Sequence, residues 1–184
     1  MEKISEKLRK VKFELEHLYK HAQDTVLGKA YVHLGNSYFD ENDPLKDYGT
    51  GIEYYIRAAS YGNADAAYYL ATYYAEHNNP EDANLYLDLA IKYGSVEAKM
   101  VKGVAEFHAG NISIAANLLE EAAKAGDPDA QYYLGMCYLE EQYSEHDYNQ
   151  GLYWLVKSAN GGNRDACARL SRIYYETGEQ RVMN

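Results

Sequence analysis

The sequence has few cysteines, and it lacks both a long apolar run and an apolar N-terminus. Two cysteines in 184 residues cannot build the disulfide framework that small secreted domains use. No apolar run reaches the about 18 residues that a membrane-spanning helix needs, so no such helix is expected. Residues Met1–Leu8 are rich in charge and lack the apolar core of a signal peptide. Together with unpaired cysteines, these absences favour a soluble, cytoplasmic protein.

Basic residues are also scarce. The chain has 18 Lys and Arg against 28 Asp and Glu, which gives a formal net charge of −10. Nucleic-acid binding requires a basic face that displaces counterions, and anionic membranes attract basic surfaces. We therefore expect neither a nucleic-acid nor a membrane partner. Hydrophobic residues at 47% and charged residues at 25% are ordinary for a folded domain, whereas 21 tyrosines against three Phe and one Trp are not.

The chain contains an internal repeat. Four pentads begin with Gly and end with an acid and Ala, and their glycines are spaced by 32, 32 and 36 residues; the pentads are Gly62–Ala66, Gly94–Ala98, Gly126–Ala130 and Gly162–Ala166. Ala30 lies 36 residues before Ala66 and opens a first unit. Units therefore start near residues 30, 66, 98, 130 and 166, which makes about four and a half repeats.

Each pentad has the chemistry of a tight turn between two helices. Glycine ends a helix because it adopts the left-handed conformation without a Cβ penalty. The next residue is a helix-capping type, and Pro128 falls at a first helical position, where its missing N–H costs nothing. The predicted caps are Asn63, Ser95, Asp127 and Asn163. A second set of predicted caps lies inside the units, at Asp47, Asn79, Asn111 and Asp147, so each unit is a helix–turn–helix hairpin.

Small and large residues recur at fixed places in the units. Small side chains permit close helix approach at Gly35, Ala71, Gly103, Gly135 and Ser171, and again at Ala58-Ala59, Ala90, Ala122-Ala123 and Ser158-Ala159. Large side chains are expected to fill the space between hairpins at Leu34, Leu70, Leu134, Leu170, Tyr38, Tyr74, Tyr138 and Tyr174. Cys137 and Cys167 are expected to be small core residues.

This pattern resembles a known repeat family. The run Ala130-x3-Leu134-Gly135-x2-Tyr138, followed by Asp147-x3-Gly151-x2-Trp154-x3-Ser158-Ala159-x2-Gly162-x3-Ala166, is similar to the Sel-one-like repeat (SLR), a relative of the tetratricopeptide repeat. The resemblance covers Ala30 to about Gly178. It implies an all-α fold, an α/α superhelical solenoid of about four and a half helix–turn–helix repeats.

The two ends of the array need separate treatment because terminal repeats expose an apolar face. An apolar stripe of Ile4, Leu8, Val11, Leu15 and Leu18 predicts an N-terminal capping helix over residues 1–23, packed on the first hairpin; a coiled-coil dimer is the alternative. The solenoid then spans 24–178. Its last helix, Asn163–Tyr175, is closed by Gly178 before a polar tail, 179–184, and it either caps the array or forms a dimer contact.

No motif in the sequence supports catalysis. The six histidines form no zincin-type or cysteine–histidine signature, and no glycine-rich phosphate loop is present. His17 and His21, four residues apart, could share a metal, but two ligands alone do not make a site. We therefore expect no enzyme, no metal and no cofactor.

The resemblance implies that the third, seventh, tenth and eleventh places of each unit face the concave side of the array. Those places hold carboxylates and large anchors, and the candidate partner-binding residues are Phe39, Asp40, Tyr68, Thr72, Glu76, Phe107, His108, Tyr132, Met136, Glu140, Arg172, Tyr175 and Glu176. The other interpretation is that these are ordinary helix-end acids and core aromatics. Tyrosine doublets such as Tyr68-Tyr69 cannot all point inward, so at least one is expected to be exposed for binding.

These observations predict a non-enzymatic protein–protein interaction module. As an adaptor or scaffold, it would bind a partner protein or basic peptide in a concave, tyrosine-rich acidic groove. The alternative is a bacterial immunity protein that neutralises a cognate toxin or secreted effector by tight binding. The sequence leaves open whether the protein is a monomer or a homodimer.

Overall fold

A computed structural model describes residues 2–39, 47–140 and 145–182, with side chains described between residues 20 and 176 of those ranges, residues 145 and 146 excepted. All regular structure in these ranges is helical, which confirms the predicted all-α fold. The helices are α1 (Glu2–Ser37), α2 (Tyr48–Ser60), α3 (Ala64–Glu76), α4 (Pro80–Lys92), α5 (Val96–His108), α6 (Ile112–Ala125), α7 (Pro128–Glu140), α8 (Glu145–Asn160) and α9 (Arg164–Val182).

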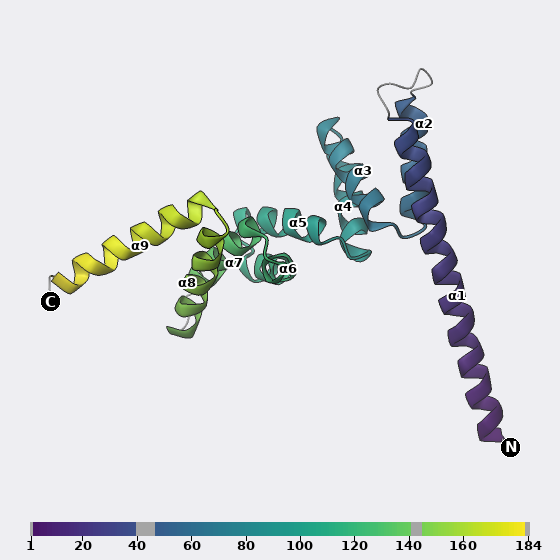
Figure 1. The fold of residues 1–184 in the computed structure, drawn as a ribbon, viewed down its shortest axis with the longest axis horizontal. Coiled ribbons are helices and arrows are strands. Elements are labelled where there is room, and N and C mark those ends of the chain that lie inside the picture. Colours follow the sequence, from purple (N-terminus) through teal and green to yellow (C-terminus); the bar gives the residue numbers. More distant parts are fainter. Residues whose placement is uncertain (1, 40–46, 141–144, 183–184) are drawn as a thin grey trace. The chain divides into compact units, whose positions relative to one another are not determined.

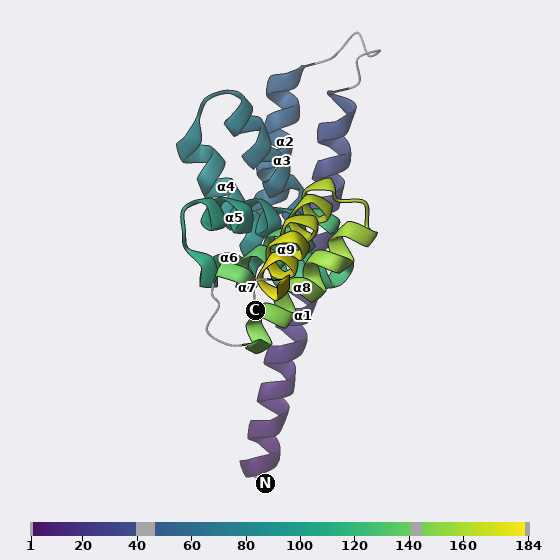
Figure 2. The same ribbon diagram turned by 90° about the vertical axis from the view of Figure 1, so that its left-hand side faces the viewer.

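The chain divides into two compact units, Met1–Ser95 and Val96–Asn184. In the N-terminal unit, α1 packs on α2, α2 on α3, and α3 on α4 (Figures 1 and 2). In the C-terminal unit, α5 packs on α6, α6 on α7, α7 on α8, and α8 on α9. We call α1, α3, α5, α7 and α9 the A helices and α2, α4, α6 and α8 the B helices, because each hairpin consists of an A helix followed by a B helix.

The turns between hairpins form as the pentads predict. Gly62, Gly94, Gly126 and Gly162 all have positive φ, between 78° and 103°. The following cap accepts a hydrogen bond from the backbone N–H three residues later at Asn63 (2.8 Å), Asp127 (2.7 Å) and Asn163 (2.8 Å). Each such bond satisfies one of the orphan donors at a helix start and contributes about 1 kcal/mol.

The caps inside the hairpins are confirmed at two of four places. Asp47 accepts from the Gly49 N–H at 3.0 Å and Asn79 from the Asp82 N–H at 3.3 Å. Asn111 makes no side-chain cap bond, and its amide nitrogen donates to Glu106 Oε2 at 2.7 Å. Asp147 is not a cap either: α8 already begins at Glu145, so Asp147 lies in its first turn.

The core consists of leucines set among small residues. Leu70, Leu119, Leu134 and Leu155 are the largest fully buried side chains, and the predicted small positions Ala58, Ala59, Ala90, Ala122, Ala123 and Ser158 are buried beside them. Ser158 replaces an alanine of the other repeats, and its hydroxyl is satisfied by donating to the Pro128 carbonyl at 2.6 Å. Small residues therefore bring the helices together, as predicted.

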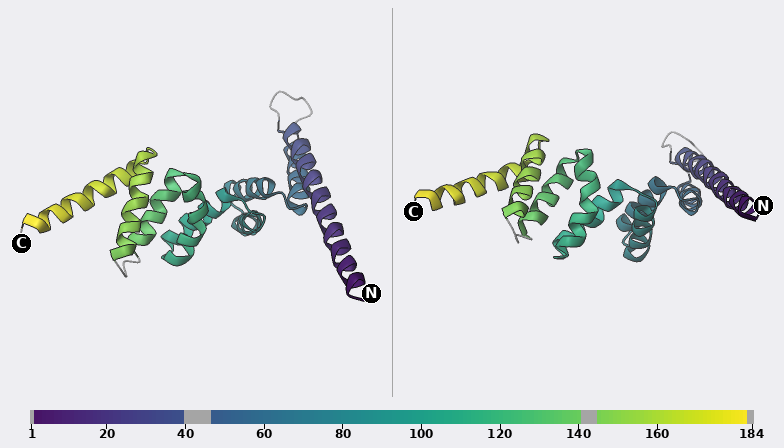
Figure 3. Two further views of the ribbon diagram at one scale, coloured as in Figure 1. Left: turned by 60° about the horizontal axis from the view of Figure 1, so that its bottom comes forward. Right: turned by 90° about the horizontal axis from the view of Figure 1, so that it is seen from below.

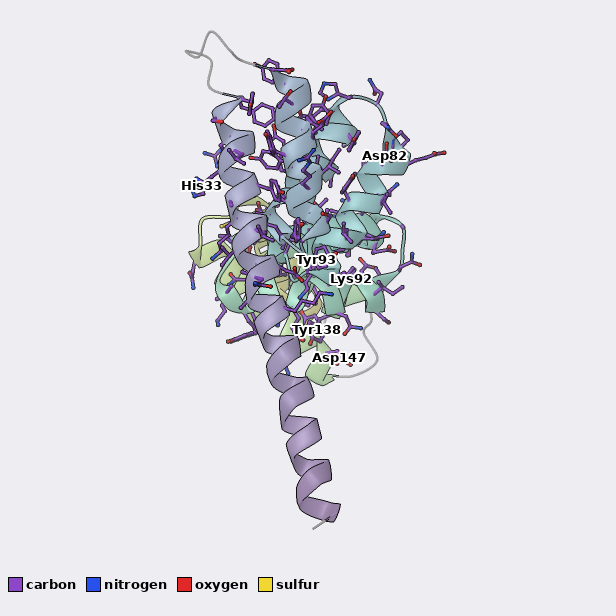
Figure 4. The ribbon with its side chains drawn as sticks, turned by 90° about the vertical axis from the view of Figure 1, so that its right-hand side faces the viewer. His33, Asp82, Lys92, Tyr93, Tyr138 and Asp147 are labelled. Atoms are coloured by element: carbon purple, nitrogen blue, oxygen red, sulfur yellow. The ribbon has the colours of Figure 1, made fainter. Side chains whose placement is uncertain are left out.

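The N-terminal end differs from the predicted arrangement. The predicted capping segment, 1–23, and the first A helix form one continuous helix, α1, with no break near residue 23 (Figure 1). A continuous helix cannot fold back over its own hairpin. Ala30 is therefore exposed and Leu34 is 45% exposed, whereas Ala66 and Leu70, at the same repeat places, are fully buried. His33, on the same open face, points away from α2 (Figure 4).

The C-terminal end also differs. Helix α9 runs through Gly178 to Val182, so Gly178 does not close it and the predicted tail begins inside the helix (Figure 3). Two core predictions on α9 are wrong: Cys167 is exposed and Tyr174 is 74% exposed, while Cys137 on α7 is buried as predicted. The cause is the same for both. Their counterparts on α7, Gln131 and Tyr138, pack in the C-terminal unit, whereas no described helix lies beside α9 where α8 lies beside α7.

Candidate functional site

In the N-terminal unit, the predicted site residue Phe39 belongs to a cluster of rings. The Phe39 ring centroid lies 5.6 Å from the centroids of Tyr48, Tyr55 and Tyr69, and the rings of Tyr55 and Tyr69 stack at 4.3 Å. Phe39 also covers Gly51, where an added Cβ would lie 2.8 Å from its ring. Phe39 is therefore a packing residue of its own hairpin. The predicted site residue Asp40 lies outside the described residues.

The outer edge of this cluster is acidic. Tyr68 is half-buried, Thr72 and Glu76 are exposed, and the Thr72 hydroxyl donates to the Tyr69 carbonyl at 2.8 Å. Burial raises the pKa of the Tyr69 phenol, and the nearby negative charge of Glu76 raises it further. The Glu76 carboxylate therefore acts electrostatically on the Tyr69 phenol.

The C-terminal unit contains a second ring cluster, at the end of α5. The Phe107 ring packs edge-on against His108 at 5.6 Å and against Tyr133 at 5.5 Å. His108 is exposed, and its Nε2 lies 3.5 Å from the Tyr133 hydroxyl. Phe107 is half-buried on the core that contains Leu119 and Leu134. This arrangement leaves His108 as the exposed group of the cluster.

The neighbouring A helix, α7, carries the next three predicted residues. Tyr132 and Met136 are half-buried against the core formed by Leu139, Leu155 and Ala166. Burial raises the pKa of Tyr132, as does the charge of Asp165, and Arg169 partly opposes the shift. Glu140 is exposed at the end of α7.

The last three predicted residues lie on α9. The Arg172 Nε donates to Glu176 Oε1 at 2.8 Å, so these two exposed charges pair within the helix. Tyr175 is 69% exposed and packs edge-on against Tyr174 at 5.9 Å. Tyr175 holds the tenth place of its unit, as Leu139 does in the unit before it. Leu139 is buried against α8, whereas Tyr175 is exposed.

The exposed groups share a position on the A helices. Glu76, His108 and Glu140 are the last residues of α3, α5 and α7. The carboxyl end of a helix is the negative end of its dipole, so a carboxylate there is disfavoured and a cation is favoured. Within the described parts of the chain, neither Glu76 nor Glu140 pairs with a Lys or Arg. Each end can therefore attract a positive group from a partner.

Four residues of these clusters are absent from the predicted site: Tyr48, Tyr55, Tyr69 and Tyr133. Tyr69 and Tyr133 occupy the fourth place of their units, between the third and seventh places that were selected. The signal was present in the doublets Tyr68-Tyr69 and Tyr132-Tyr133, in which one ring packs beside the other; the Tyr132 and Tyr133 centroids are 5.1 Å apart. Of the predicted exposed doublets, Tyr174-Tyr175 is the one with both rings largely exposed.

The described residues contain no group of three or more His, Cys, Asp or Glu side chains that could hold a metal ion. Among the helices in those same ranges, none is both long enough and apolar enough to span a bilayer. His21 is exposed, and the side chain of His17 lies outside the described residues.

Consecutive helical hairpins joined by glycine turns define a helical-repeat protein. The model of the Sel1 repeat matches residues 28–63, 106–127, 128–163 and 164–183, which is more than half of the chain. The chain belongs to the Sel1 repeat family, and the predicted SLR resemblance is confirmed. Proteins with this repeat are generally protein-interaction modules and typically not enzymes. The matches skip residues 64–105, which include Lys102 where other units have leucine.

The relatives extend beyond this chain. Sel1-repeat-containing protein YjcO of Escherichia coli (strain K12) is 42% identical over 53 residues, which cover 29% of this chain and 21% of that protein. YjcO of Shigella flexneri matches to the same extent. The chain thus spans about a fifth of the length of these curated relatives.

Two solved structures share the fold. The crystal structure of c5321, described as a protective antigen present in uropathogenic Escherichia coli strains displaying an SLR fold, superposes with a TM-score of 0.68 at 27% identity, over 89% of this chain and 36% of that one. A Sel1 repeat protein from Oxalobacter formigenes gives a TM-score of 0.68 at 24% identity, over 85% and 48% of the two chains. Both support a solenoid of SLR type.

Proposed function

We propose that this protein is a non-enzymatic adaptor that binds a basic segment of a partner protein at the carboxyl ends of its A helices. The observation that carries the proposal is the placement of exposed carboxylates, Glu76 and Glu140, at the carboxyl ends of α3 and α7. The same two helices carry half-buried tyrosines about two turns earlier, Tyr68 and Tyr132. Thr72, His108, Arg172 and Glu176 are the further exposed polar groups of the proposed surface.

The energetics favour a charged encounter followed by apolar contact. A Lys or Arg of the partner would interact with the carboxylate and with the negative end of the same helix dipole. An exposed ion pair contributes only about 0.2–1 kcal/mol, so these charges are expected to set the association rate and its salt dependence more than the affinity. Affinity would come from the tyrosines, which offer a large contact area and lose little conformational entropy.

A cytoplasmic location is part of the same proposal. Neither Cys137 nor Cys167 forms a disulfide, and Cys167 is exposed. Exposed free thiols persist in reducing compartments, whereas oxidising ones convert them to disulfides.

The test is affinity capture from a lysate of the source cell. The bait is the tagged chain, compared with Glu76→Lys/Glu140→Lys, which reverses the two helix-end charges. The control is Glu53→Lys/Glu120→Lys, which makes the same charge change at exposed sites on B helices. We expect a partner with a basic segment to be captured by the wild type and the control and lost by the helix-end variant.

Equal capture by all three baits would refute the proposed surface. A single partner that the helix-end variant still holds stoichiometrically in high salt would instead favour the alternative function, an immunity protein that blocks one folded toxin or effector by tight binding.

A further inference from the structure

Helix α9 exposes a face that the other A helices bury. It packs on α8 through Ala166, Leu170 and Ile173. The opposite face carries Cys167, Ser171 and Tyr175, and all three are exposed. Their counterparts on α7 are Gln131, Gly135 and Leu139, which are buried. In α7 this face packs on a B helix, so the open face of α9 has the shape that receives one.

The contact between the two helices of a hairpin is nearly two-fold symmetric. A Cβ added to Gly135 of α7 would lie 3.0 Å from the Gly151 carbonyl oxygen and 3.0 Å from Leu155 Cγ. A Cβ added to Gly151 of α8 would lie 3.1 Å from the Gly135 carbonyl oxygen and 2.8 Å from Leu139 Cγ. In each helix the glycine therefore contacts a large side chain of the other helix, and that side chain lies four positions after the other helix's own glycine.

The first hairpin repeats this exchange with aromatic rings. A Cβ on Gly35 of α1 would lie 2.7 Å from the ring of Tyr55, and one on Gly51 of α2 would lie 2.8 Å from the ring of Phe39. A and B helices thus carry the same signature on their contact faces. It consists of a small residue, an aromatic or large residue three positions later, and a large apolar or aromatic residue at the fourth.

Helix α9 carries the complete B-helix signature on its open face. Its sequence Ser171-x2-Tyr174-Tyr175-x2-Gly178 has the pattern of Gly51-x2-Tyr54-Tyr55-x2-Ala58 in α2. The same face also holds the repeat places through which an A helix contacts its B helix, because Ser171 and Tyr175 correspond to Gly135 and Leu139 of α7. One surface therefore contains both halves of the contact and is complementary to itself.

We propose that two copies of this chain form an antiparallel dimer through α9, in which each α9 packs on the other as α8 packs on α7. Ser171 of one copy lies opposite Tyr175 of the second copy, as Gly135 lies opposite Leu155. The Ser171 hydroxyl donates to the Cys167 carbonyl at 2.9 Å, so it is satisfied within its own helix. Ala71 of α3, buried against α4, shows that a hairpin accepts a Cβ at this place.

The charge of the chain gives the dimer a salt dependence opposite to that of the proposed partner binding. Each copy carries a formal charge of −10, so two copies repel, and added salt screens that repulsion. Salt would therefore strengthen the α9 dimer, whereas it weakens the encounter with a basic segment. The two proposals can fail independently.

The first test is sedimentation equilibrium of the full chain over a range of concentrations and salt. The wild type is expected to reach twice its 20.9 kDa monomer mass at the high end, and Tyr175→Lys is expected to remain a monomer. The control is Leu34→Lys, which places the same charge on the other open face, on α1, and should still dimerise. A wild type that is monomeric throughout, or a dimer abolished by Leu34→Lys and not by Tyr175→Lys, overturns the proposal.

The second test probes the geometry of the α9 contact by disulfide cross-linking, and it does not require that the two copies bind each other tightly. Both variants carry Cys167→Ser, which leaves the buried Cys137 as the remaining native thiol. In Ser171→Cys the new thiols of the two copies meet at the proposed contact, and mild oxidation should yield a covalent dimer. In Glu176→Cys the new thiol is exposed on the side of α9 away from Ser171, because five residues turn a helix by about 140°, and it should yield little. Equal cross-linking of the two variants, or none in Ser171→Cys, contradicts the antiparallel α9 contact.

Discussion

The glycine pair at the centre of the α7–α8 hairpin gives the sharpest stability prediction. In Gly135→Ala, the new Cβ would lie 3.0 Å from the Gly151 carbonyl oxygen and 3.1 Å from the Leu155 backbone nitrogen. Backbone atoms of a packed helix cannot rotate away, so the two helices must separate. Overpacking of this kind costs about 1–3 kcal/mol. It is opposed by the gain of about 1 kcal/mol that alanine brings to a helix interior. We expect a net loss of about 1 kcal/mol.

The matched variant is Ala71→Gly, at the same repeat place in α3. Here the helix loses about 1 kcal/mol of propensity and the contact loses a buried methyl group worth about 0.8 kcal/mol. If helix propensity alone mattered, the two substitutions would have opposite signs. Because each hairpin is fitted to the side chain that it carries, both should destabilise.

Urea unfolding followed by far-UV circular dichroism measures both variants against the wild type. The expected result is a lower midpoint in each case. A midpoint raised by Gly135→Ala would refute the close-approach argument, since it would show that the helices accept a Cβ there without moving.

Three further predictions use the same measurement. Ala123→Leu, at a fully packed seam, should lower stability by about 1–3 kcal/mol, and an unchanged midpoint would contradict its placement. Asn163→Ala removes the cap bond to Ala166 and should cost about 1 kcal/mol, whereas Asn111→Ala, which removes no cap bond, should cost less; equal losses would be inconsistent with these caps. The pKa of the Tyr69 phenol is raised in the folded protein above its ordinary 10.0. Its contribution to the free energy of unfolding is therefore complete below that ordinary pKa and is lost as the pH rises through the raised pKa of the folded protein. Tyr69→Phe should therefore flatten the alkaline loss of stability, and an unchanged alkaline profile would count against this.

The turns were predictable because their chemistry is local. A positive-φ glycine followed by a capping side chain determines where one helix ends and the next begins, whatever packs around it. Asn63, Asp127 and Asn163 accordingly cap as expected. Asn111 has the residue type and spacing of a cap but makes no side-chain cap bond, because sequence spacing does not determine how its amide is oriented.

The ends of the array were not predictable because burial depends on neighbours. Leu34 and Tyr174 have the residue type and repeat place of core positions, yet each is exposed where no described helix covers it. The candidate surface shows the same limit. Helix-end carboxylates such as Glu76 are exposed whatever their neighbours, whereas the orientation of Phe39 into its own hairpin depends on the glycine opposite it.

The most direct test of the proposed function is the association rate of the captured partner with the full chain, measured at low and high salt. With the wild type, we expect association to slow as salt rises. With Glu76→Lys/Glu140→Lys, we expect association slowed by about tenfold or more at low salt and much less dependent on salt, with dissociation changed far less. Identical association rates for the wild type and this variant at low salt would contradict the claim that the helix-end carboxylates recruit a basic partner.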